Sequence, residues 1–237
     1  MSHKAADRLL IQGARRDLSP EIVAKLARLL TALAAEPAPP TTVTDPDEAV
    51  DVHIADSLSG LEAPPLLAAT SIADLGAGAG FPGLALAAAL PNARVDSIEA
   101  TGRKCEVIAH LANAAELGNA TAIPIRAEEW ASSDGANRYE AVTARALSSL
   151  AVLVEYAAPL LELDGALVAW KGARDDQEER AGAEAARMVG LTPSAPIPVR
   201  PYKGSRERNL YVYVKTEPTP DRFPRRPGMA TKRPLAG

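Results

Sequence analysis

The sequence predicts an α/β fold in which a mostly parallel sheet of seven strands carries an antiparallel edge strand. Apolar segments alternate with helical patterns from Ser71 to Val189, as in parallel sheets covered by helices on both faces. A glycine-rich turn at Gly76, Gly78 and Gly80 joins the first strand to the first of these helices. The last two apolar segments are separated by a basic loop without a helix, which predicts antiparallel pairing.

A helical extension over residues 1–62 precedes the sheet. Ser19-Pro20-Glu21 has the pattern of a helix start, with a capping hydroxyl, a proline in the first turn and an acid near the positive end of the helix dipole. Leucines at helical spacing continue to Leu33, and prolines end the helix after Glu36. An amphipathic segment, 47–61, then predicts a second helix.

The other elements lie in a domain that we place at residues 63–217. The predicted helices follow the first, second and fourth strands, and a polar helix follows the fifth. The strands are expected at Ile72–Leu75, Val95–Ile98, Ala122–Ile125, Tyr139–Ala144, Gly165–Trp170, Val199–Arg200 and Leu210–Lys215; the helices end near Leu90, Leu117, Leu161 and Val189.

The glycine-rich turn predicts a nucleotide-like ligand. Glycine without a Cβ lets a ligand approach the backbone, and Pro82 fits the first turn of the following helix, whose free N–H groups face the turn. Asp74 is a charged residue at the end of an apolar strand, where it needs a partner. Glu99 ends the next strand about 20 residues later, where a ribose-binding carboxylate stands in nucleotide-binding βαβ units.

Ligands of open parallel sheets bind at the carboxyl ends of the strands. Besides Glu99, the residues at such positions include Ala127 and Glu128 after the third strand, Arg145 after the fourth and Lys171 after the fifth. The two cations could hold an anionic substrate or a carboxylate, or could form surface ion pairs. Their position favours a role in the site.

Composition favours a soluble cytoplasmic protein. The chain has 237 residues, 47% of them hydrophobic and 24% charged. Its apolar runs are too short to span a membrane, and residues 1–12 do not resemble a signal peptide. The single cysteine, Cys105, cannot form an internal disulfide, and we expect it to be structural. We predict no metal site.

The net charge of −4 is unevenly distributed. From Val199 to Gly237, ten Lys and Arg residues stand against three acids, so this part carries +7 and the rest carries −11. A basic, irregular tail is expected over residues 218–237. This asymmetry favours an anionic partner, and a solvated tail is the alternative.

An ordered set of motifs resembles the bacterial 16S rRNA guanine-N7 methyltransferases of the RsmG (GidB) family. The resemblance runs from about Pro46 to the C-terminus, and the family's Asn-Leu-Thr appears here as Pro39-Pro40-Thr41. Its motifs are His53-Ile54-Ala55-Asp56-Ser57-Leu58, Asp74-Leu75-Gly76-Ala77-Gly78-Ala79-Gly80-Phe81-Pro82-Gly83, Arg126-Ala127-Glu128-Glu129, Arg145-Ala146, Lys171-Gly172 and Pro224-Arg225-Arg226.

The resemblance implies a Rossmann-like, class I methyltransferase fold with S-adenosylmethionine as cofactor. The expected partner is 16S rRNA or the small ribosomal subunit, with neither DNA nor a membrane, and we expect a monomer. The implied cofactor contacts, together with the carboxylate from the βαβ pattern, are Gly76, Gly78, Phe81, Glu99, Ala127, Glu128 and Arg145. The cations expected to bind RNA are Lys171, Lys203, Arg206, Arg208, Arg225 and Arg226.

Guanine N7 has an exposed lone pair and no proton, so methylation there requires no general base. We therefore predict no catalytic acid or base, and treat His53 and Asp56 as possible pocket residues. Arg145 is assigned to the cofactor or a phosphate, because an arginine aimed at N7 would block its lone pair. The alternatives are a small-molecule methyltransferase, a nucleotide-binding oxidoreductase and a non-catalytic RNA-binding assembly factor.

Overall fold

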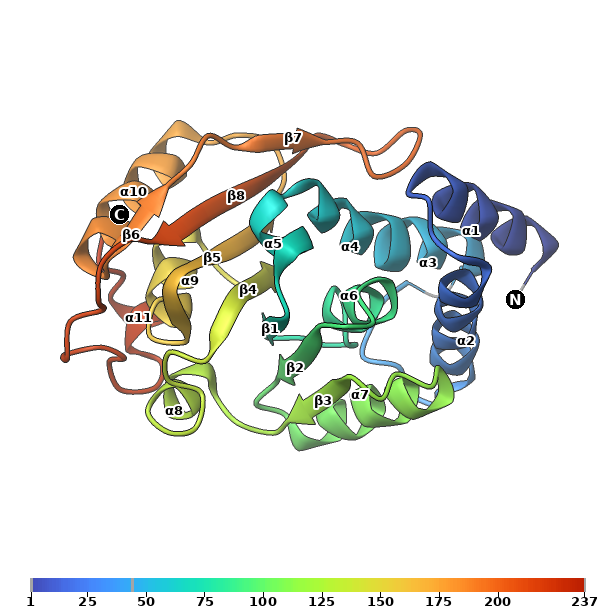
Figure 1. Ribbon diagram of the computed structural model, residues 1–237, viewed down its shortest axis with the longest axis horizontal. Coiled ribbons are helices and arrows are strands. Elements are labelled where there is room, and N and C mark those ends of the chain that lie inside the picture. Colours follow the sequence, from blue (N-terminus) through green and yellow to red (C-terminus); the bar gives the residue numbers. More distant parts are fainter. Residues whose placement is uncertain (1, 44, 237) are drawn as a thin grey trace.

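The computed structural model describes residues 2–43 and 45–236, which form one sheet with helices on both sides (Figure 1). The strand order is β3-β2-β1-β4-β5-β8-β6, and β7 also pairs with β8. The strands are β1 (Ser71–Leu75), β2 (Arg94–Ile98), β3 (Ala120–Ile123), β4 (Tyr139–Arg145), β5 (Leu161–Lys171), β6 (Leu191–Pro193), β7 (Ile197–Val199) and β8 (Arg208–Lys215).

The first five strands form the parallel part of the sheet. The central strand β1 pairs in parallel with β2 on one side and with β4 on the other, and β4 pairs in parallel with β5. Their carboxyl ends therefore meet at one edge. The α/β alternation predicted from the sequence is confirmed.

The antiparallel end differs from the prediction in one respect. β7 and β8 pair antiparallel as expected, with Val199 opposite Arg208. However, β8 lies between β5 and β6, and β6 and β7 both lie along its outer side, so the described residues form eight strands instead of seven. β6 is three residues long and contains Pro193. A proline cannot donate a ladder hydrogen bond, and an edge position tolerates this loss.

The helices form two layers around the sheet. Helices α1, α2, α6 and α7 contribute to a core on one face, and α9 and α10 to a core on the other. They are α1 (His3–Arg15), α2 (Pro20–Ala35), α3 (Pro46–Ala49), α4 (Asp56–Leu58), α5 (Pro64–Ala68), α6 (Gly83–Ala89), α7 (Gly102–Ala114), α8 (Ala127–Ala131), α9 (Leu150–Ala157), α10 (Asp176–Met188) and α11 (Met229–Lys232).

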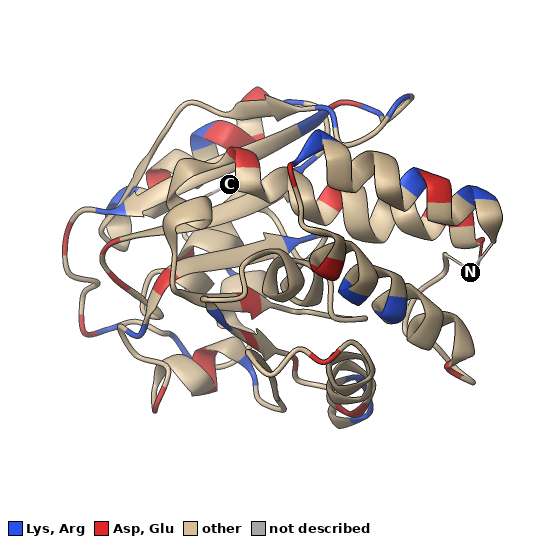
Figure 2. Ribbon diagram, turned by 45° about the vertical axis from the view of Figure 1, so that its right-hand side comes forward, with Lys and Arg blue, Asp and Glu red and all other residues tan. Residues whose placement is uncertain are grey.

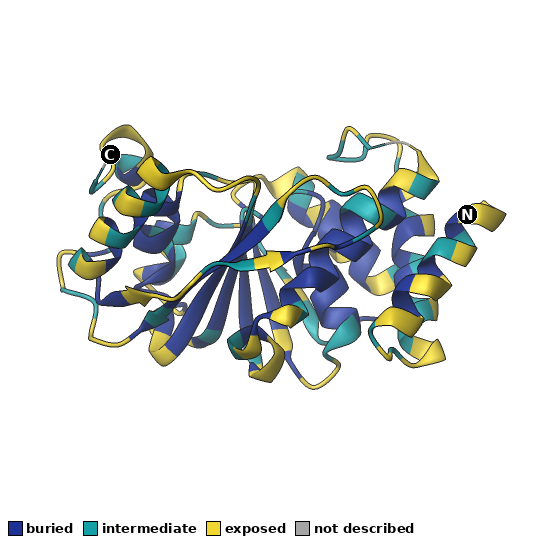
Figure 3. Ribbon diagram, turned by 90° about the horizontal axis from the view of Figure 1, so that it is seen from above, coloured by how far each residue is buried: buried dark blue, intermediate teal, exposed yellow. Residues whose placement is uncertain are grey.

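Alternate residues of the central strands enter opposite cores. Ile72 packs in the core with α6, whereas Ala73 and Leu75 pack in the core with α9. Figure 3 shows the strands buried along most of their length. Because helices cover both faces of the sheet, these strands do not alternate between apolar residues on one face and polar residues on the other. None of the helices in residues 2–43 and 45–236 is long and apolar enough to cross a membrane.

The predicted start of α2 is confirmed. Ser19 is the N-cap, and its hydroxyl oxygen accepts a hydrogen bond from the Ile22 N–H at 3.3 Å, while Pro20 occupies the first turn. Leu26, Leu29 and Leu33 are the buried face of this helix. α1 packs beside α2 at one end of the molecule, far from the C-terminus (Figure 1).

The amphipathic segment 47–61 is not a single regular helix. α3 leads into a π-helix, η1 (Val50–Ala55), followed by α4 and a 3₁₀ turn, η2 (Ser59–Glu62). The apolar pattern correctly predicted helical structure with one buried side, but spacing alone cannot distinguish i+5 from i+4 hydrogen bonding. π-turns occur frequently at functional sites, and this one carries His53.

The C-terminal tail, expected to be irregular, contains the short helix α11 and packs on the body. Phe223 and Ala230 are buried, and the Thr219 hydroxyl donates to the carbonyl of Ala158 at 3.1 Å. Arg225 donates two hydrogen bonds to the buried carboxylate of Glu155 on α9. Part of the tail's positive charge is therefore used within the fold.

Candidate functional site

The glycine-rich turn forms the floor of the site. Gly76, Gly78 and Gly80 have φ angles of 61°, 58° and 93°, which lie in the region that glycine adopts at little cost. A Cβ on Gly76 would also lie 2.5 Å from Cδ1 of Leu147. The backbone at the end of β1 is thus shaped by residues that cannot be exchanged without strain.

Asp74 connects this turn to the start of α6. Its fully buried carboxylate accepts hydrogen bonds of 2.8 Å from the N–H of Gly83 and from the Thr143 hydroxyl. Burial raises the pKa of Asp74 to about 6, although these hydrogen bonds act in the opposite direction. A Cβ on Gly83 would lie 2.8 Å from the same carboxylate. The partner that Asp74 requires is therefore the α6 backbone.

A first cavity of about 510 Å³ opens above the turn, at the carboxyl ends of the strands. Its volume is in the range of small-molecule sites. The structure brings together in its wall all the residues that sequence analysis assigned to the cofactor: Gly76, Gly78, Phe81, Glu99, Ala127, Glu128 and Arg145. Pro40 and Thr41, where the chain departs from the family pattern, also line it.

Glu99 is fixed at the end of β2 by two backbone groups. Its Oε2 accepts from the N–H of Gly78 at 3.1 Å, and its Oε1 accepts from the N–H of Thr101 at 2.9 Å. The side chain is buried but lines the cavity. Cys105 is buried behind it and donates its S–H to the Glu99 carbonyl. Burial, and next the Glu99 charge, raise the pKa of this thiol, which fits a structural residue.

Glu128 connects the cavity to the C-terminal tail. It lies in the first turn of α8, and its Oε1 accepts a hydrogen bond of 2.7 Å from the N–H of Gly228. Tyr156 of α9 also lines the cavity, and its hydroxyl lies 3.1 Å from the Thr231 hydroxyl of the tail. The tail thus supports the wall formed by α8 and α9, a role that sequence analysis did not identify.

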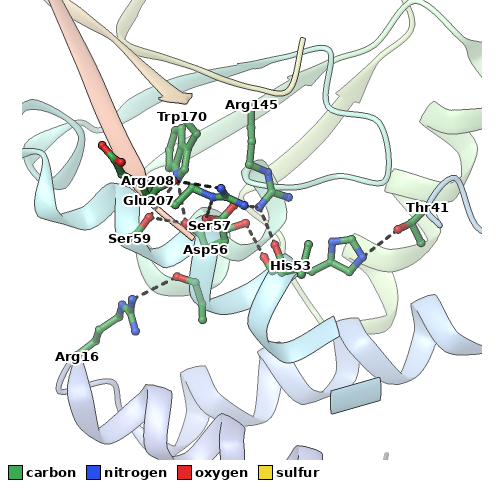
Figure 4. Close-up of polar contacts among 12 residues, drawn as sticks. Arg16, Thr41, His53, Asp56, Ser57, Ser59, Arg145, Trp170, Glu207 and Arg208 are labelled. Atoms are coloured by element: carbon green, nitrogen blue, oxygen red, sulfur yellow. Dashed lines mark hydrogen bonds and ion pairs between the residues drawn. The ribbon is translucent and has the colours of Figure 1, made fainter. Parts of the chain in front are cut away.

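A second cavity of about 450 Å³ adjoins the first. The two share Thr41, His53, Arg145 and Ala146 as wall residues. The second is further enclosed by side chains from η1, α4, β5 and β8, among them Asp56, Trp170, Lys171 and Arg208. Residues more than 150 positions apart in the sequence therefore meet here (Figure 4).

An ion pair between the buried Asp56 and the partly buried Arg145 organises the second cavity. Nη1 of Arg145 donates to Oδ2 of Asp56 and to the carbonyl of Val52, both at 2.8 Å. Nε of Arg208 lies 3.4 Å from Oδ1 of Asp56. The indole N–H of Trp170 donates to the backbone carbonyl of Asp56 at 2.9 Å. Arg145 therefore stands between the two cavities instead of facing the first alone.

His53 also lines both cavities. Its ring stacks on Phe81 with a centroid distance of 4.8 Å, and its Nε2 lies 3.1 Å from the Thr41 hydroxyl. Burial, and secondarily the charge of Arg145, lower the pKa of His53 to about 4. The ring is thus neutral near pH 7. Its Nδ1 has no hydrogen-bond partner among residues 2–43 and 45–236.

The cations assigned to RNA are distributed over three places. Lys171 and Arg208 line the second cavity, with Lys171 also 2.6 Å from a carboxylate oxygen of Glu178. Lys203 and Arg206 are exposed on the loop between β7 and β8. Arg225 and Arg226 lie in the tail, where Arg226 is exposed. Figure 2, in which Lys and Arg positions are blue, shows them on several separate elements of the ribbon.

Solved structures share the fold. The cofactor-bound Rv0187 from MTB superposes with a TM-score of 0.53 at 18% identity. The match covers 84% of this chain and 91% of that chain. A predicted O-methyltransferase, Atu636 from Agrobacterium tumefaciens, gives a TM-score of 0.52 at 23% identity, covering 69% of this chain and 81% of its own. These likenesses support the Rossmann-like class predicted from the sequence.

The family model GidB, described as rRNA small subunit methyltransferase G, matches residues 25–199. Ribosomal RNA small subunit methyltransferase G of Rubrobacter xylanophilus is 38% identical over 197 residues, which cover 81% of this chain and 76% of the relative. The protein of the same name from Chloroflexus aggregans is 40% identical, with 82% of each chain covered. The resemblance seen in the motifs is confirmed: the chain belongs to the GidB family of rRNA small subunit methyltransferase G proteins.

Proposed function

We propose that this protein transfers a methyl group from S-adenosylmethionine to N7 of a guanine in 16S rRNA. The observation that carries the proposal is the pair of adjoining cavities in a member of this family. The first has the glycine turn and the Glu99 carboxylate of a nucleoside site. The second adjoins it through His53 and Arg145, so a donor and an acceptor can be held side by side.

The residues of the first cavity fit the cofactor. A carboxylate can accept roughly four hydrogen bonds. That of Glu99 accepts two from backbone N–H groups, which leaves two positions for ribose hydroxyls. A Cβ on Gly78 would have its nearest neighbour at 3.8 Å, the carbonyl oxygen of Gly76, so its absence leaves open space for a ligand. When bound, S-adenosylmethionine supplies an electrophilic methyl carbon on a positively charged sulfur.

The protein's task is to position the base and exclude water. Guanine N7 attacks with its own lone pair, so no residue has to remove a proton. The neutral His53, stacked on Phe81, suits this role because it adds no positive charge beside the attacking nitrogen. Alignment alone can contribute roughly 7–11 kcal/mol to a group transfer.

Charge and exposure support an RNA substrate. Lys203 and Arg206 are exposed on the β7–β8 loop, which leads into Arg208 at the second cavity. Their charges can bind phosphates while a base enters the cavity, and a base must be presented out of its stack to be reached. Lys171, Arg225 and Arg226 extend the basic surface in this proposal. The division into residues 1–62, 63–217 and 218–237, a monomeric state and a cytoplasmic location remain predictions.

The proposal is tested in two steps. The first is mass mapping of 16S rRNA nucleosides after the purified protein has acted on RNA or small subunits from cells that lack the gene. We expect one 7-methylguanosine to appear with S-adenosylmethionine as donor. Methyl transfer to metabolites but to no RNA would favour the small-molecule alternative, and binding of RNA without transfer would favour the assembly factor.

The second step tests the cofactor site by calorimetry with S-adenosylhomocysteine. Glu99→Gln is expected to weaken binding roughly 10- to 100-fold, because hydrogen bonds to a charged group contribute about 1.5–3 kcal/mol. Glu106→Gln is the matched control, because Glu106 is an exposed carboxylate on α7 that does not line the first cavity. Equal affinity of wild type and Glu99→Gln would remove Glu99 from the site.

A further inference from the structure

The second cavity has a single carboxylate among its lining residues, and one oxygen of that carboxylate lacks a hydrogen bond. Asp56 is 6% exposed. Its Oδ2 accepts from Arg145, whereas Oδ1 has no hydrogen-bond partner among residues 2–43 and 45–236 and only faces Nε of Arg208 at 3.4 Å. A buried acceptor without a donor destabilises the fold, and more so when it is charged. A ligand that brings donors to Oδ1 would recover this energy.

Arg145, which is bound to the same carboxylate, has unused hydrogen-bond donors. Nη1 uses its two hydrogens on Asp56 and on the Val52 carbonyl. Within the described residues, Nη2 and Nε of Arg145 make no further hydrogen bond. The guanidinium also lines both cavities. The pair therefore presents an acceptor, Asp56, beside a donor, Arg145, at the boundary between the cavities (Figure 4).

We propose that Asp56 and Arg145 read the identity of the target base, with Asp56 accepting from N1–H and the 2-amino group of guanine and Arg145 donating to O6. This inference rests on the proposed function and assigns the second cavity to the acceptor base. Guanine is the base with two donors, N1–H and the amino group, next to an acceptor, O6. Along this edge of guanine, the two donors would therefore face the Asp56 carboxylate, and the acceptor O6 would face the Arg145 guanidinium.

This orientation moves Arg145 from the cofactor or phosphate role expected from the sequence to O6 of the base, and it leaves N7 free. O6 lies between N1 and N7 on the edge of the purine, so a base with N1 at Asp56 and O6 at Arg145 has N7 beyond Arg145, toward the first cavity. Arg208 covers Oδ1 and is 31% exposed, so it can move aside as the base enters. The Trp170 hydrogen bond to the Asp56 backbone and the Val52 hydrogen bond to Arg145 hold the pair in place.

The same pair rejects adenine. Adenine places a lone pair at N1, opposite the carboxylate, and an amino group at position 6, opposite the guanidinium. The Asp56 carboxylate would then face another acceptor, and the Arg145 guanidinium would face another donor. Sites built for hydrogen bonding strongly reject a base that leaves their polar groups unpaired. Specificity for guanine thus follows from two side chains on separate elements, α4 and β4.

The first test uses base analogues at the target position of a synthetic RNA or reconstituted subunit. Inosine keeps N7, N1–H and O6 but lacks the 2-amino group. We expect wild-type protein to methylate guanosine roughly 10- to 100-fold more efficiently, in kcat/KM, than inosine. Equal kcat/KM for the two bases would overturn the inference while leaving the proposed function intact. A failure to methylate guanosine itself would instead contradict the proposed function.

The second test crosses the analogue with a protein variant. In Asp56→Asn the guanosine-to-inosine ratio is expected to fall below about threefold, because the variant has already lost the charged acceptor. Asp51→Asn is the matched control: Asp51 is a carboxylate on η1 that pairs with Arg8 and does not line the second cavity, so its ratio should equal that of wild type. A wild-type ratio in an active Asp56→Asn variant would overturn the inference.

Loss of folding is monitored separately. Binding of S-adenosylhomocysteine to Asp56→Asn, measured by calorimetry, reports whether the first cavity is intact. If the variant binds this ligand and transfers no methyl group, the wild-type ratio and the control decide. A wild-type ratio near one contradicts the inference, whereas a large ratio, with transfer lost in Asp56→Asn and kept in Asp51→Asn, supports base reading by Asp56.

Discussion

The two adjoining cavities at the carboxyl ends of the strands are built in different ways. The floor of the first is formed by the backbone that follows β1 and β2, where three glycines have positive φ and the N–H groups of Gly78 and Thr101 hold the carboxylate of Glu99. The second is formed by side chains from η1, α4, β4, β5 and β8, joined by the ion pair of Asp56 and Arg145. A shared wall of His53 and Arg145 connects them.

This difference indicates which kind of substitution would damage each site. A backbone site depends on glycines and on the short-range geometry of strand, turn and helix, so it is damaged by added volume. A site of buried charges depends on each partner being present, because an unpaired buried charge is costly. The two kinds of site should therefore fail through different substitutions, which the following predictions examine.

The largest effect is expected in the second cavity. Arg145→Met removes one partner of a buried ion pair and leaves Asp56 with Arg208 alone, so the free energy of unfolding should fall by about 3–5 kcal/mol. Urea denaturation measures this loss. The double variant Arg145→Met/Asp56→Asn should recover part of it. A variant Arg145→Met as stable as wild type would show that the ion pair does not organise this cavity.

A smaller effect is expected beneath the first cavity, where the start of α6 packs against Asp74. Gly83→Ala places a Cβ 2.8 Å from the Asp74 carboxylate and 2.9 Å from the Ser97 hydroxyl, so it should destabilise the fold by about 1–3 kcal/mol through overpacking. Gly102→Ala is the matched control. Gly102 also begins a helix, but a Cβ there meets nothing within 4 Å, so this variant should gain about 0.5–1 kcal/mol. Thermal or urea unfolding of both variants would sharpen the comparison, and equal stability would contradict it.

The effect that is smallest at pH 7, and that grows as the solution becomes acidic, concerns the wall between the cavities. Burial lowers the pKa of His53 to about 4, below the ordinary histidine value of 6.5. Between these pH values the unfolded chain binds more protons at this residue, so its contribution to stability is present near pH 7 and is lost as the pH falls from 6.5 toward 4. The slope is at most about 1.4 kcal/mol per pH unit.

His53→Gln isolates this contribution. Asp74, whose pKa is raised to about 6, acts in the opposite direction over the acidic part of the same range, so wild type alone gives a mixed slope. The difference in unfolding free energy between wild type and His53→Gln removes the Asp74 contribution. This difference should change with pH between 6.5 and 4, to the disadvantage of wild type at low pH. A difference independent of pH would show that His53 is not buried as a neutral ring.

Much of the fold could be predicted from the sequence because it is encoded locally. Ser19 and Pro20 specify the start of α2, and the glycines after Leu75 specify the turn at the end of β1. β6 was missed, because three residues that include Pro193 give no apolar pattern. The π-helix η1 was missed because apolar spacing in a segment of six residues does not determine the hydrogen-bonding pattern.

The site shows the same division. The residues assigned to the cofactor all line one cavity, because parallel strands bring their carboxyl ends to one edge. The partners of these residues were not visible in the sequence. Nothing near Arg145 or Arg225 in the chain indicates that the first would pair with Asp56 and the second with Glu155.

The sequence by itself determined the alternation of strands and helices, the glycine turn with its carboxylate at Glu99, and the family. These depend on periodicity and on backbone preferences that act over a few residues. Only the tertiary structure decided that Arg145 stands between two cavities, that His53 is a neutral ring on Phe81, and that the tail is bound to α8 and α9. Pairing of buried charges and loss of water depend on which distant elements pack together, and the folded chain alone brings them into contact.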